Sequence, residues 1–491
     1  MLLSMLAGEA LSYALELRGD CEILSLCDDS REKAPQGLFF CIRGSHYDAH
    51  AFAADAVRNG ACALVVTEFQ DGLDVPQLRV SDVRPAMALM ARAFYGFPDR
   101  EMKLVGITGT KGKTTTSYLV KAILEENGAR VGLIGTTGSM IGDRWVDSTL
   151  TTPDPIELHR TFRQMADAGC AYVVMEVSAH AVAMHRLEGL TFEAGCFTNL
   201  SHEHLDYFST MENYYQAKKK FFTGGMVRNA VLSLDDEWAA RLSREIAVPS
   251  VTYGICTNAD LFARDIQIRE DGVSFLLGLF NDRFCPVDMR LMGMFNIYNA
   301  MAAAGIGLVL GVEPEVVCDA LESVRTVPGR AEVLDTHTDY KVILDYSHSP
   351  DALENILSAL RTVTKGRIIA VFGCGGERDA TKRPVMGAIA GRMADLSILT
   401  SDNPRAEDPM DILGAIVEGI EPTGGTYEVI ENRREAIRRA MALARSGDVV
   451  LLAGKGHETY QEILGVKRPF NEKQIVADLL REERAGGKAN A

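Results

Sequence analysis

Short apolar runs, separated by polar and glycine-rich turns, recur along most of this chain. In the clearest case, a run of β-forming residues at 104–107 is followed by a glycine-rich turn at 109–112 and then by apolar positions at helical spacing from Leu119 to Leu124. This change in the spacing of apolar residues predicts a strand, a tight turn and an amphipathic helix that ends near Gly128. Extended and helical patterns alternate on both sides of this segment, so the predicted fold class is α/β.

The pattern divides the chain into three predicted domains, which its length of 491 residues allows. Residues 1–97 form the first, a small α/β domain. Within it, 2–17 has the spacing of a helix, and the apolar runs 37–42 and 61–67 predict strands. A turn-like cluster at 96–99 predicts the end of this domain.

Residues 98–327 form the second predicted domain, with a mostly parallel sheet around the strand, turn and helix described above. Alternation at 261–289 predicts a β-rich insertion, and an alanine-rich helix begins near Gly293. The other predicted strands are 130–134, 171–178, one that ends at 197–200, and 229–234; the other predicted helices are 156–168 and 214–222.

The third predicted domain, 328–491, alternates strands and helices as a Rossmann-like unit does. The predicted strands are 341–345, 367–373, 396–401 and 449–453, and the predicted helices are 351–360, 409–418 and 433–444. A polar cluster follows each strand, at 345–350, 375–379, 402–405 and 454–458. Because the carboxyl ends of parallel strands meet at one edge of a sheet, these clusters predict a binding cleft.

Composition and charge narrow the possible partners. Hydrophobic residues make up 47% of the chain and charged residues 24%, and the formal charge is 51 minus 67, or −16. Such an acidic chain is not expected to bind nucleic acid or membrane surfaces in general. The apolar run 300–312 is too short to span a bilayer, and the N-terminus lacks the basic start of a signal peptide. Ten cysteines without a C-x-x-C pair fit a reduced cytosol, so a cytoplasmic protein without disulfides or a zinc site is expected.

The turn after the central strand has the features of a phosphate-binding loop. Backbone N–H groups at a helix N-terminus can bind an anion, Lys113 can reach terminal phosphates, and the Thr114 hydroxyl can ligate magnesium. The usual pattern has four residues between its first glycine and Gly-Lys, whereas Gly109 lies too close to Gly112, and Gly106 one residue too far from it. The alternative is a glycine-rich turn with a solvated lysine; the second lysine and the run of threonines favour the phosphate loop.

Two residues at predicted strand ends are candidates for a metal site. Glu176 closes a buried apolar run, where an acid is the usual second magnesium anchor of a phosphate-loop enzyme. The alternative is a surface carboxylate. His204 lies just past another strand end, among polar groups at 201–206, which favours a metal site over a structural or solvated histidine.

Two further clusters are ambiguous from the residues alone. The run 218–220 contains three lysines, for which a solvated basic face is the preferred interpretation, although like charges so close make one neutral amine more accessible. Asn296 and Asn299 lie on one predicted helix face, where purine recognition and helix capping fit equally well.

Taken in order, these motifs resemble the Mur ligase family, and the resemblance covers essentially the whole chain. It is carried by Gly-Thr-Lys-Gly-Lys-Thr-Thr at 109–115, Met-Glu-Val-Ser at 175–178, Phe-Thr-Asn-Leu at 197–200, Gly-x-Phe-Asn-x-x-Asn at 293–299 and Asp-Tyr-x-His at 345–348. In the first domain, the segments 29–31 and 37–40, with Gly44 and Asp48, match the family pattern that holds a UDP-sugar. Asp-Asn-Pro-Arg at 402–405 is similar to the motif of the branch that recognises meso-diaminopimelate; lysine-adding relatives usually lack its arginine.

The resemblance implies an ATP-dependent amide ligase. ATP would phosphorylate the D-Glu side-chain carboxylate of UDP-MurNAc-L-Ala-D-Glu, and the diaminopimelate amine would attack the acyl phosphate through a tetrahedral intermediate. The products are an amide, ADP and phosphate. Carboxylates are poor electrophiles, so phosphorylation supplies a leaving group, and the transfer needs charge neutralisation more than covalent help. Small-molecule substrates, ATP and Mg²⁺, with a monomeric protein, are therefore expected.

The same resemblance assigns roles to individual residues. Lys113 would stabilise the γ-phosphate, Thr114 and Glu176 would hold one magnesium ion, and His204 would help to hold a second. By its position, Lys218 matches the lysine that the family carries as a carbamate. The residues alone favour a solvated lysine instead. The ATP set is Gly109, Thr110, Lys111, Gly112, Lys113, Thr114, Thr115, Asn296, Asn299, Arg330 and His348. The UDP-MurNAc-dipeptide set is Ser30, Thr151, Thr152, Ser178 and Arg186. The diaminopimelate set is Arg378, Asp402, Asn403, Pro404, Arg405, Gly454 and Glu458.

Several residues depart from the family pattern without changing the expected reaction class. They concern the muramyl pocket and its surroundings: Ala49 for a usual Gly, Leu150 and Met184 where relatives often have Asn and Gln, Ala179 for Ser, and Glu203 for Asp. The alternatives are a lysine-adding relative, a folylpolyglutamate synthetase, a nucleotide-binding regulatory module without turnover and a phosphate-loop kinase. A folylpolyglutamate synthetase would lack the first domain, and a kinase needs no second Rossmann-like domain.

Overall fold

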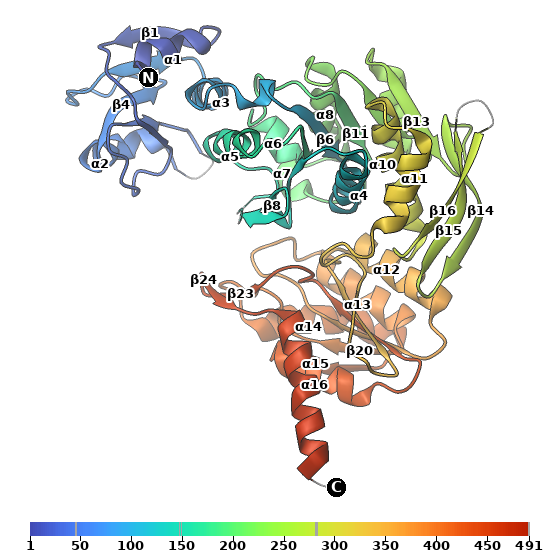
Figure 1. Ribbon diagram of the computed structural model, residues 1–491. Helices are drawn as coiled ribbons and strands as arrows, with labels where there is room; N and C mark the ends of the chain where they lie inside the picture. Colours follow the sequence, from blue (N-terminus) through green and yellow to red (C-terminus); the bar gives the residue numbers. More distant parts are fainter. Residues whose placement is uncertain (45–46, 147, 149, 280–282, 490–491) are drawn as a thin grey trace.

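Three large sheets follow one another along the chain in the computed structural model (Figure 1). The structure describes residues 1–44, 47–146, 148, 150–279 and 283–489. Each sheet falls inside one of the three predicted domains, whose boundaries remain predictions. In Figure 1 the first sheet lies beside the central one, and the third lies below it.

The first sheet has five strands in the order β1-β5-β4-β3-β2. Its strands are β1 (Ala14–Arg18), β2 (Ser25–Cys27), β3 (Gly37–Phe40), β4 (Ala61–Val66) and β5 (Gln77–Val80), and its helices are α1 (Leu3–Glu9), α2 (Ala53–Arg58) and α3 (Val83–Phe94). The prediction of one helix over 2–17 is wrong, because the helix ends at Glu9 and the chain returns as β1, antiparallel to β5. Leu17 pairs with Leu78 there, and the alternation of leucine with Glu16 and Arg18 is the period of a strand.

The central sheet has eleven strands and is parallel in its middle. Its strands are β6 (Lys103–Thr108), β7 (Val131–Gly135), β8 (Gly138–Ile141), β9 (Arg144–Val146), β10 (Tyr172–Glu176), β11 (Ala194–Phe197), β12 (Ala230–Ser233), β13 (Ser250–Gly254), β14 (Leu261–Arg269), β15 (Gly272–Leu279) and β16 (Arg283–Met289). The order is β16-β15-β14-β13-β12-β11-β6-β10-β7-β8-β9, with antiparallel pairs only at the two ends of the described sheet. This agrees with the predicted mostly parallel sheet and β-rich insertion.

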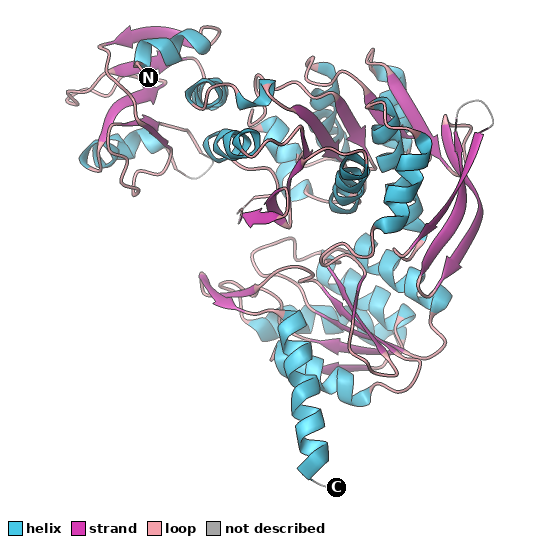
Figure 2. Ribbon diagram, viewed as in Figure 1, coloured by secondary structure: helices cyan, strands magenta, loops and turns pink. Residues whose placement is uncertain are grey.

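Helices cover both faces of the central sheet, as Figure 2 shows. They are α4 (Lys113–Glu126), α5 (Pro155–Asp167), α6 (Ala179–Ala183), α7 (Leu205–Phe208), α8 (Met211–Thr223), α9 (Glu237–Glu245), α10 (Met294–Val309) and α11 (Pro314–Ser323). Apolar residues of α4, α10 and α11 pack in one core cluster, and those of α5, α8 and α9 pack in another. Burial on both faces explains why the central strands are apolar throughout rather than alternating.

Strand β6 occupies the middle of the central sheet, between β10 and β11. Gly106 lies against the rings of Phe221 and Phe192, where a Cβ would come within 3.0 Å of Phe192. The parallel pairing of β6 with β10 and β11 places Thr108 and Glu176 at the same edge of the sheet. Parallel sheets bind ligands at this edge.

The third sheet has six strands in the order β17-β18-β22-β19-β20-β21, parallel except for β17. The strands are β17 (Glu332–Leu334), β18 (Lys341–Asp345), β19 (Ile368–Phe372), β20 (Leu396–Leu399), β21 (Tyr427–Val429) and β22 (Val449–Ala453); a separate hairpin consists of β23 (Tyr460–Ile463) and β24 (Val466–Pro469). The helices are α12 (Pro350–Val363), α13 (Lys382–Met393), α14 (Pro409–Ile420), α15 (Arg433–Leu443) and α16 (Glu472–Ala489). Helices α12 to α14 pack on one face and α15 and α16 on the other, as in a Rossmann-like domain.

The α/β fold class with three sheets is therefore confirmed. No helix in the described part of the chain is long and apolar enough to cross a membrane.

Candidate functional site

The phosphate-binding loop connects β6 to α4 and needs glycine at two positions. Gly109 has φ 145° and Gly112 has φ 85°, which favour glycine. A Cβ at Gly109 would collide with the Thr198 hydroxyl, and one at Gly112 would collide with the Asn299 side chain. The loop is thus packed tightly between strand ends and α10, with the N-terminus of α4 at its base.

Two lysines, the partly buried Lys113 and the buried Lys218, meet at the first residues of this loop. Lys113 Nζ donates to the Gly109 and Thr110 carbonyls at 2.9 and 3.0 Å. Lys218 Nζ, from α8, donates to the same Gly109 carbonyl at 2.9 Å and to Thr108 Oγ1 at 3.3 Å. Burial lowers the pKa of Lys113, and burial together with the Lys113 charge lowers the pKa of Lys218 well below its usual value. Lys218 is therefore no solvated surface lysine, as the residues alone had suggested, since it is 1% exposed.

Glu176 is a buried carboxylate that accepts three hydrogen bonds. Thr114 Oγ1 and the Thr136 N–H both donate to Oε1 at 2.9 Å, and Thr136 Oγ1 donates to Oε2 at 3.0 Å. Arg330, from the linker into the third sheet, donates through Nη2 to Thr114 Oγ1 at 3.0 Å. The alternative of a surface carboxylate does not hold, because Glu176 is 1% exposed. The loop threonine and the strand-end acid thus lie next to each other.

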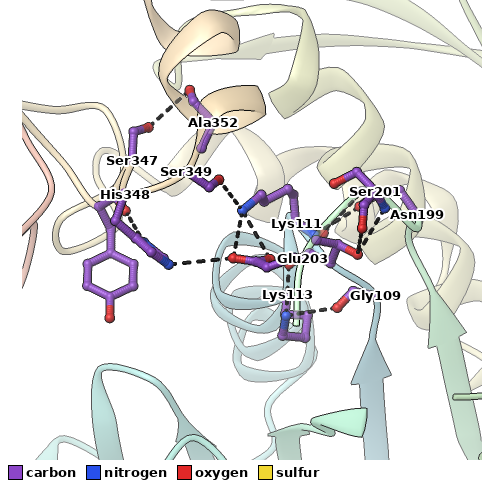
Figure 3. Close-up of polar contacts among 12 residues, drawn as sticks. Gly109, Lys111, Lys113, Asn199, Ser201, Glu203, Ser347, His348, Ser349 and Ala352 are labelled. Carbon is purple, nitrogen blue, oxygen red and sulfur yellow. Dashed lines mark hydrogen bonds and ion pairs between the residues drawn. The ribbon is translucent and has the colours of Figure 1, made fainter. Parts of the chain in front are cut away.

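Glu203 connects the phosphate loop to the third sheet, as Figure 3 shows. Lys111 Nζ donates to its two carboxylate oxygens at 3.2 and 3.1 Å and to Ser349 Oγ at 2.8 Å. His348 Nε2 lies 3.5 Å from Glu203 Oε1. Burial raises the pKa of Glu203, but the charge of Lys111 and the hydrogen bond with His348 outweigh it and hold the pKa well below its usual value. The structure thereby brings Lys111 and His348 together through a residue that the sequence analysis noted only as a departure.

His204 caps the short helix α7 with a left-handed backbone, φ 58°. Its ring lies against His180 and Tyr214, with centroids 5.1 and 5.9 Å apart. Burial lowers the pKa of His204 to about 4, so the imidazole is neutral at ordinary pH. Among the described residues, no group of three His, Cys, Asp or Glu side chains could hold a metal ion by itself.

The two asparagines of α10 are hydrogen-bonded to each other. Asn299 Nδ2 donates to Asn296 Oδ1 at 2.9 Å, and Asn296 Nδ2 donates to the Met292 carbonyl at 2.8 Å. Thr116 Oγ1, from α4, lies 3.5 Å from Asn299 Oδ1. These contacts tie α10 to the loop helix, while purine recognition stays a prediction.

Four of the five residues predicted for the muramyl substrate cluster beside Glu176. Thr152 Oγ1 donates to the Glu176 carbonyl at 2.8 Å and accepts from the Ser178 N–H at 3.0 Å. Arg186 Nη1 donates to the Thr152 carbonyl at 2.7 Å, and Thr151 Oγ1 lies 3.1 Å from Thr136 Oγ1.

The fifth residue, Ser30, lies in the first domain, on a cavity of about 900 Å³. Asp29, Arg31 and Phe39 line the same cavity, together with Ala49, one of the departures. Of the other departures, the Met184 sulfur lies 3.8 Å from Arg186 Nη2, and Ala179 is buried in α6.

Most of the residues predicted for diaminopimelate meet where β20 and β22 end. Asn403 Nδ2 donates to Glu458 Oε2 at 3.0 Å. Arg405 donates to the Gly376 carbonyl at 2.6 Å and pairs with Glu462 at 3.3 Å. A Cβ on Gly454 would lie 2.6 Å from Asp402 Oδ2. Pro404 continues this loop, and Arg378 is exposed on the turn after β19.

Two residues of this region were not singled out from the sequence. Lys455 is completely buried and donates to Glu458 Oε2 at 2.8 Å. The His457 ring lies tilted against Tyr346, with ring centroids 5.0 Å apart, and burial and the Arg330 charge lower the pKa of His457 to about 4. The sequence signal for both residues was the polar cluster 454–458. The sequence does not show which residues of this cluster are buried.

Two segments of the chain, which contain the second and third sheets, match models of known families. Residues 107–307 match the family model described as the Mur ligase middle domain. Residues 329–456 match the model described as the Mur ligase, glutamate ligase domain.

Curated relatives match over nearly the whole chain. The UDP-N-acetylmuramoyl-L-alanyl-D-glutamate–2,6-diaminopimelate ligase 1 of Clostridium acetobutylicum is 43% identical over 465 residues, which cover 94% of this chain and 95% of the relative. The ligase of the corresponding name from Geobacillus thermodenitrificans is 42% identical over 490 residues, which cover 98% and 99%.

Solved structures of similar proteins share the fold. A UDP-N-acetylmuramoyl-L-alanyl-D-glutamate–2,6-diaminopimelate ligase is 30% identical, with a TM-score of 0.66 over 94% of this chain and 95% of the other. MurF ligase from Thermotoga maritima, solved in complex with ADP, is 19% identical, with a TM-score of 0.62 over 94% and 97%. The second likeness concerns the fold alone.

Proposed function

Since the chain belongs to the Mur ligase family, whose members are ATP-dependent amide-bond-forming ligases, we propose that it adds meso-diaminopimelate to the D-Glu residue of UDP-MurNAc-L-Ala-D-Glu. The observation that carries this proposal is the identity of 42–43% over nearly the full length to relatives named as this ligase. The product is the UDP-MurNAc-tripeptide used in peptidoglycan synthesis. The lysine-adding and folylpolyglutamate alternatives are not favoured, because the relatives carry the diaminopimelate name.

The first half of the reaction is assigned to the loop between β6 and α4. Lys113, together with the N–H groups at the start of α4, would bind the β- and γ-phosphates of ATP. Gly109, Thr110, Gly112 and Thr115 would form the rest of the cradle. The partly buried position of Lys113 would strengthen its attraction for the transferring phosphoryl group.

The residues around Glu176 fit a magnesium ion. Mg²⁺ usually binds one or two carboxylates, phosphate oxygens and water, and Thr114 and Glu176 offer two oxygen donors that already lie 2.9 Å apart. When bound, magnesium neutralises charge on the β- and γ-phosphates. Thr114 and Glu176 would orient one ion, and a carbamate on Lys218 with the neutral His204 would complete a second site.

The second half of the reaction is assigned to the loops of the third sheet. Arg405 would bind the distal carboxylate of diaminopimelate as a guanidinium fork, and Glu458 would bind its distal ammonium. Arg378, Asp402, Asn403, Pro404 and Gly454 would shape this pocket. Arg330 and His348 lie where the second and third sheets meet, which suits ATP-side contacts that form when the domains close.

The acceptor nucleotide is assigned to the first sheet and to the residues beside Glu176. The cavity at Ser30 would hold the UDP moiety. Thr151, Thr152, Ser178 and Arg186 would then place the dipeptide carboxylate near the γ-phosphate, because Thr152 contacts the Glu176 backbone. The acidic charge balance favours small-molecule substrates over nucleic acid or membrane surfaces. The protein would act as a monomer in the cytoplasm.

The experiment is phosphate release from ATP and magnesium with UDP-MurNAc-L-Ala-D-Glu, comparing meso-diaminopimelate with L-lysine. We expect release that depends on diaminopimelate and yields the tripeptide nucleotide. Release with lysine alone would keep the ligase and contradict the assigned amino acid. No release with either would contradict the assigned acceptor and direct attention to Leu150 and Met184.

A further inference from the structure

Lys455 is a buried cation directly beside the residues assigned to diaminopimelate. Its side chain is 0% exposed, and its ammonium donates to Asn403 Oδ1 at 3.1 Å and to Glu458 Oε2 at 2.8 Å. Removing an ammonium from water is unfavourable, and replacing such a buried pair with apolar residues often stabilises a protein. Stability alone is therefore a weak reason for a lysine at this place.

The lysine and a backbone N–H together determine which way the Asn403 amide points. Asn403 Oδ1 accepts from Lys455 Nζ and from the Glu462 N–H at 2.9 Å. Both partners are donors, so the oxygen of the amide must face them and the NH₂ group must face the other way. That NH₂ group donates to Glu458 Oε2 at 3.0 Å.

As a result, the two oxygens of Glu458 have different surroundings. Oε2 receives hydrogen bonds from both Lys455 and Asn403. For Oε1, the contact found within the described part of the chain is the Tyr346 hydroxyl at 3.5 Å, the outer limit of a hydrogen bond. Oε1 is therefore the oxygen available to a cationic group that enters the pocket.

We propose that Lys455 is a positioning residue that gives the ligase its preference for an amino acid with a distal ammonium, by holding Glu458 with Oε1 available to that group. The inference rests on the proposed function and concerns its amino-acid specificity. Lys455 acts through Glu458 and Asn403 and does not itself contact the ligand. Arg405 supplies the separate preference for a distal carboxylate.

The test compares two amino acids in the wild type and in Lys455→Met. Meso-diaminopimelate has both distal groups, whereas L-2-aminopimelate keeps the attacking amine and the distal carboxylate but lacks the distal ammonium. Hydrogen bonds to charged groups contribute about 1.5–3 kcal/mol. We therefore expect kcat/KM for diaminopimelate to fall about 10- to 100-fold in Lys455→Met, with the value for aminopimelate changed less than about threefold. The KM for ATP should stay the same.

Lys467→Met is the matched control. Lys467 lies over the same Tyr460 ring as Lys455, with its ammonium 4.4 Å from the centroid, but it is exposed on β24. This variant should keep both kcat/KM values. Equal losses with both amino acids in Lys455→Met would indicate a merely structural role and overturn the proposal.

A second variant covers the case in which Lys455→Met does not fold. Glu458→Gln changes a side chain that is 15% exposed and should lose the same preference for diaminopimelate over aminopimelate. In the Glu458→Gln background, Lys455→Met should remove little further preference, since both act on one contact. A preference that persists in Glu458→Gln overturns the proposal. A wild type that releases no phosphate with diaminopimelate would instead refute the proposed function.

Discussion

The ammonium groups of Lys113 and Lys218 both donate a hydrogen bond to the carbonyl oxygen of Gly109, each at 2.9 Å. Two cations that share one carbonyl repel each other, and Lys218 is almost completely removed from water. Burial lowers both pKa values, and the charge of Lys113 lowers that of Lys218 further. A neutral amine on Lys218 would be the form that reacts with carbon dioxide: an N–C bond would form, a proton would be released, and the lysine would become an anionic carbamate. That product would turn repulsion between Lys113 and Lys218 into attraction.

Lys218→Ala is expected to reduce ligase activity at least about 100-fold, because it removes an anionic ligand near the transferring phosphoryl group. Added short carboxylates such as formate or acetate should restore part of the rate by occupying the vacated space. Phosphate release with and without these anions measures both effects. Lys220→Ala, on the exposed face of the same helix, is the control and should be unaffected. Full activity in Lys218→Ala would eliminate the carbamate.

Glu176→Gln tests the assigned magnesium anchor. Glutamine keeps the shape of the side chain but loses its charge, so it binds a divalent cation more weakly. We expect the magnesium concentration for half-maximal rate to rise about tenfold, with a lower maximal rate. Glu193→Gln is a suitable control, because Glu193 pairs with Arg228 before the start of β11, which does not border the strand of Glu176. An unchanged magnesium dependence in Glu176→Gln would exclude the role.

The sequence predicted the strand ends and loops because their signals are local. Glu176, for example, closes an apolar run, and glycines mark the turn before Lys113. The prediction of a helix over 2–17 was wrong because the conformation around Leu17 depends on strand pairing with Leu78, which lies far along the chain. The contacts of Glu203 and Lys455 were missed for a similar reason. Glu203 contacts residues that are far away in the sequence, and Lys455 differs from the other polar side chains of its cluster in being buried. The spacing of residues along the chain shows neither property.

Asp448, at the start of β22, is expected to stabilise the third sheet in a pH-dependent way. Its buried carboxylate accepts from the Arg367 guanidinium at 2.7 Å and from the Arg445 N–H at 2.9 Å. Burial raises the pKa of Asp448, but these hydrogen bonds outweigh it and hold the pKa below its usual value. A lowered pKa means that this stabilisation is fully present above about pH 4, the value in the unfolded chain, and is lost as the pH falls through the folded-state value.

Asp448→Asn should therefore destabilise the third sheet by about 2 kcal/mol at pH 7, which urea unfolding can measure as a lower midpoint. The difference from wild type should shrink below about pH 4. Glu435→Gln provides the comparison, because its pair with Arg438 is exposed and should contribute less than about 0.5 kcal/mol. A difference that does not depend on pH would show that the charge of Asp448 is unimportant.

Arg405 is expected to determine the preference for diaminopimelate over lysine, which lacks the distal carboxylate. Its guanidinium is held by the Gly376 carbonyl at 2.6 Å and by Glu462 at 3.3 Å, and its backbone N–H donates to the Glu462 carbonyl of β23 at 3.1 Å. Arg405→Ala should lower kcat/KM for diaminopimelate about 100-fold or more, because it removes a two-pronged contact with a carboxylate. The KM for ATP should change little, since the phosphate loop lies on another sheet.

Arg405→Lys should recover only part of the loss, because a single ammonium cannot reproduce the fork. Arg468→Ala, an exposed arginine on the neighbouring strand β24, should leave both constants unchanged. An equal loss for ATP and diaminopimelate in Arg405→Ala would mean that the residue supports the fold of the loop rather than recognising the amino acid.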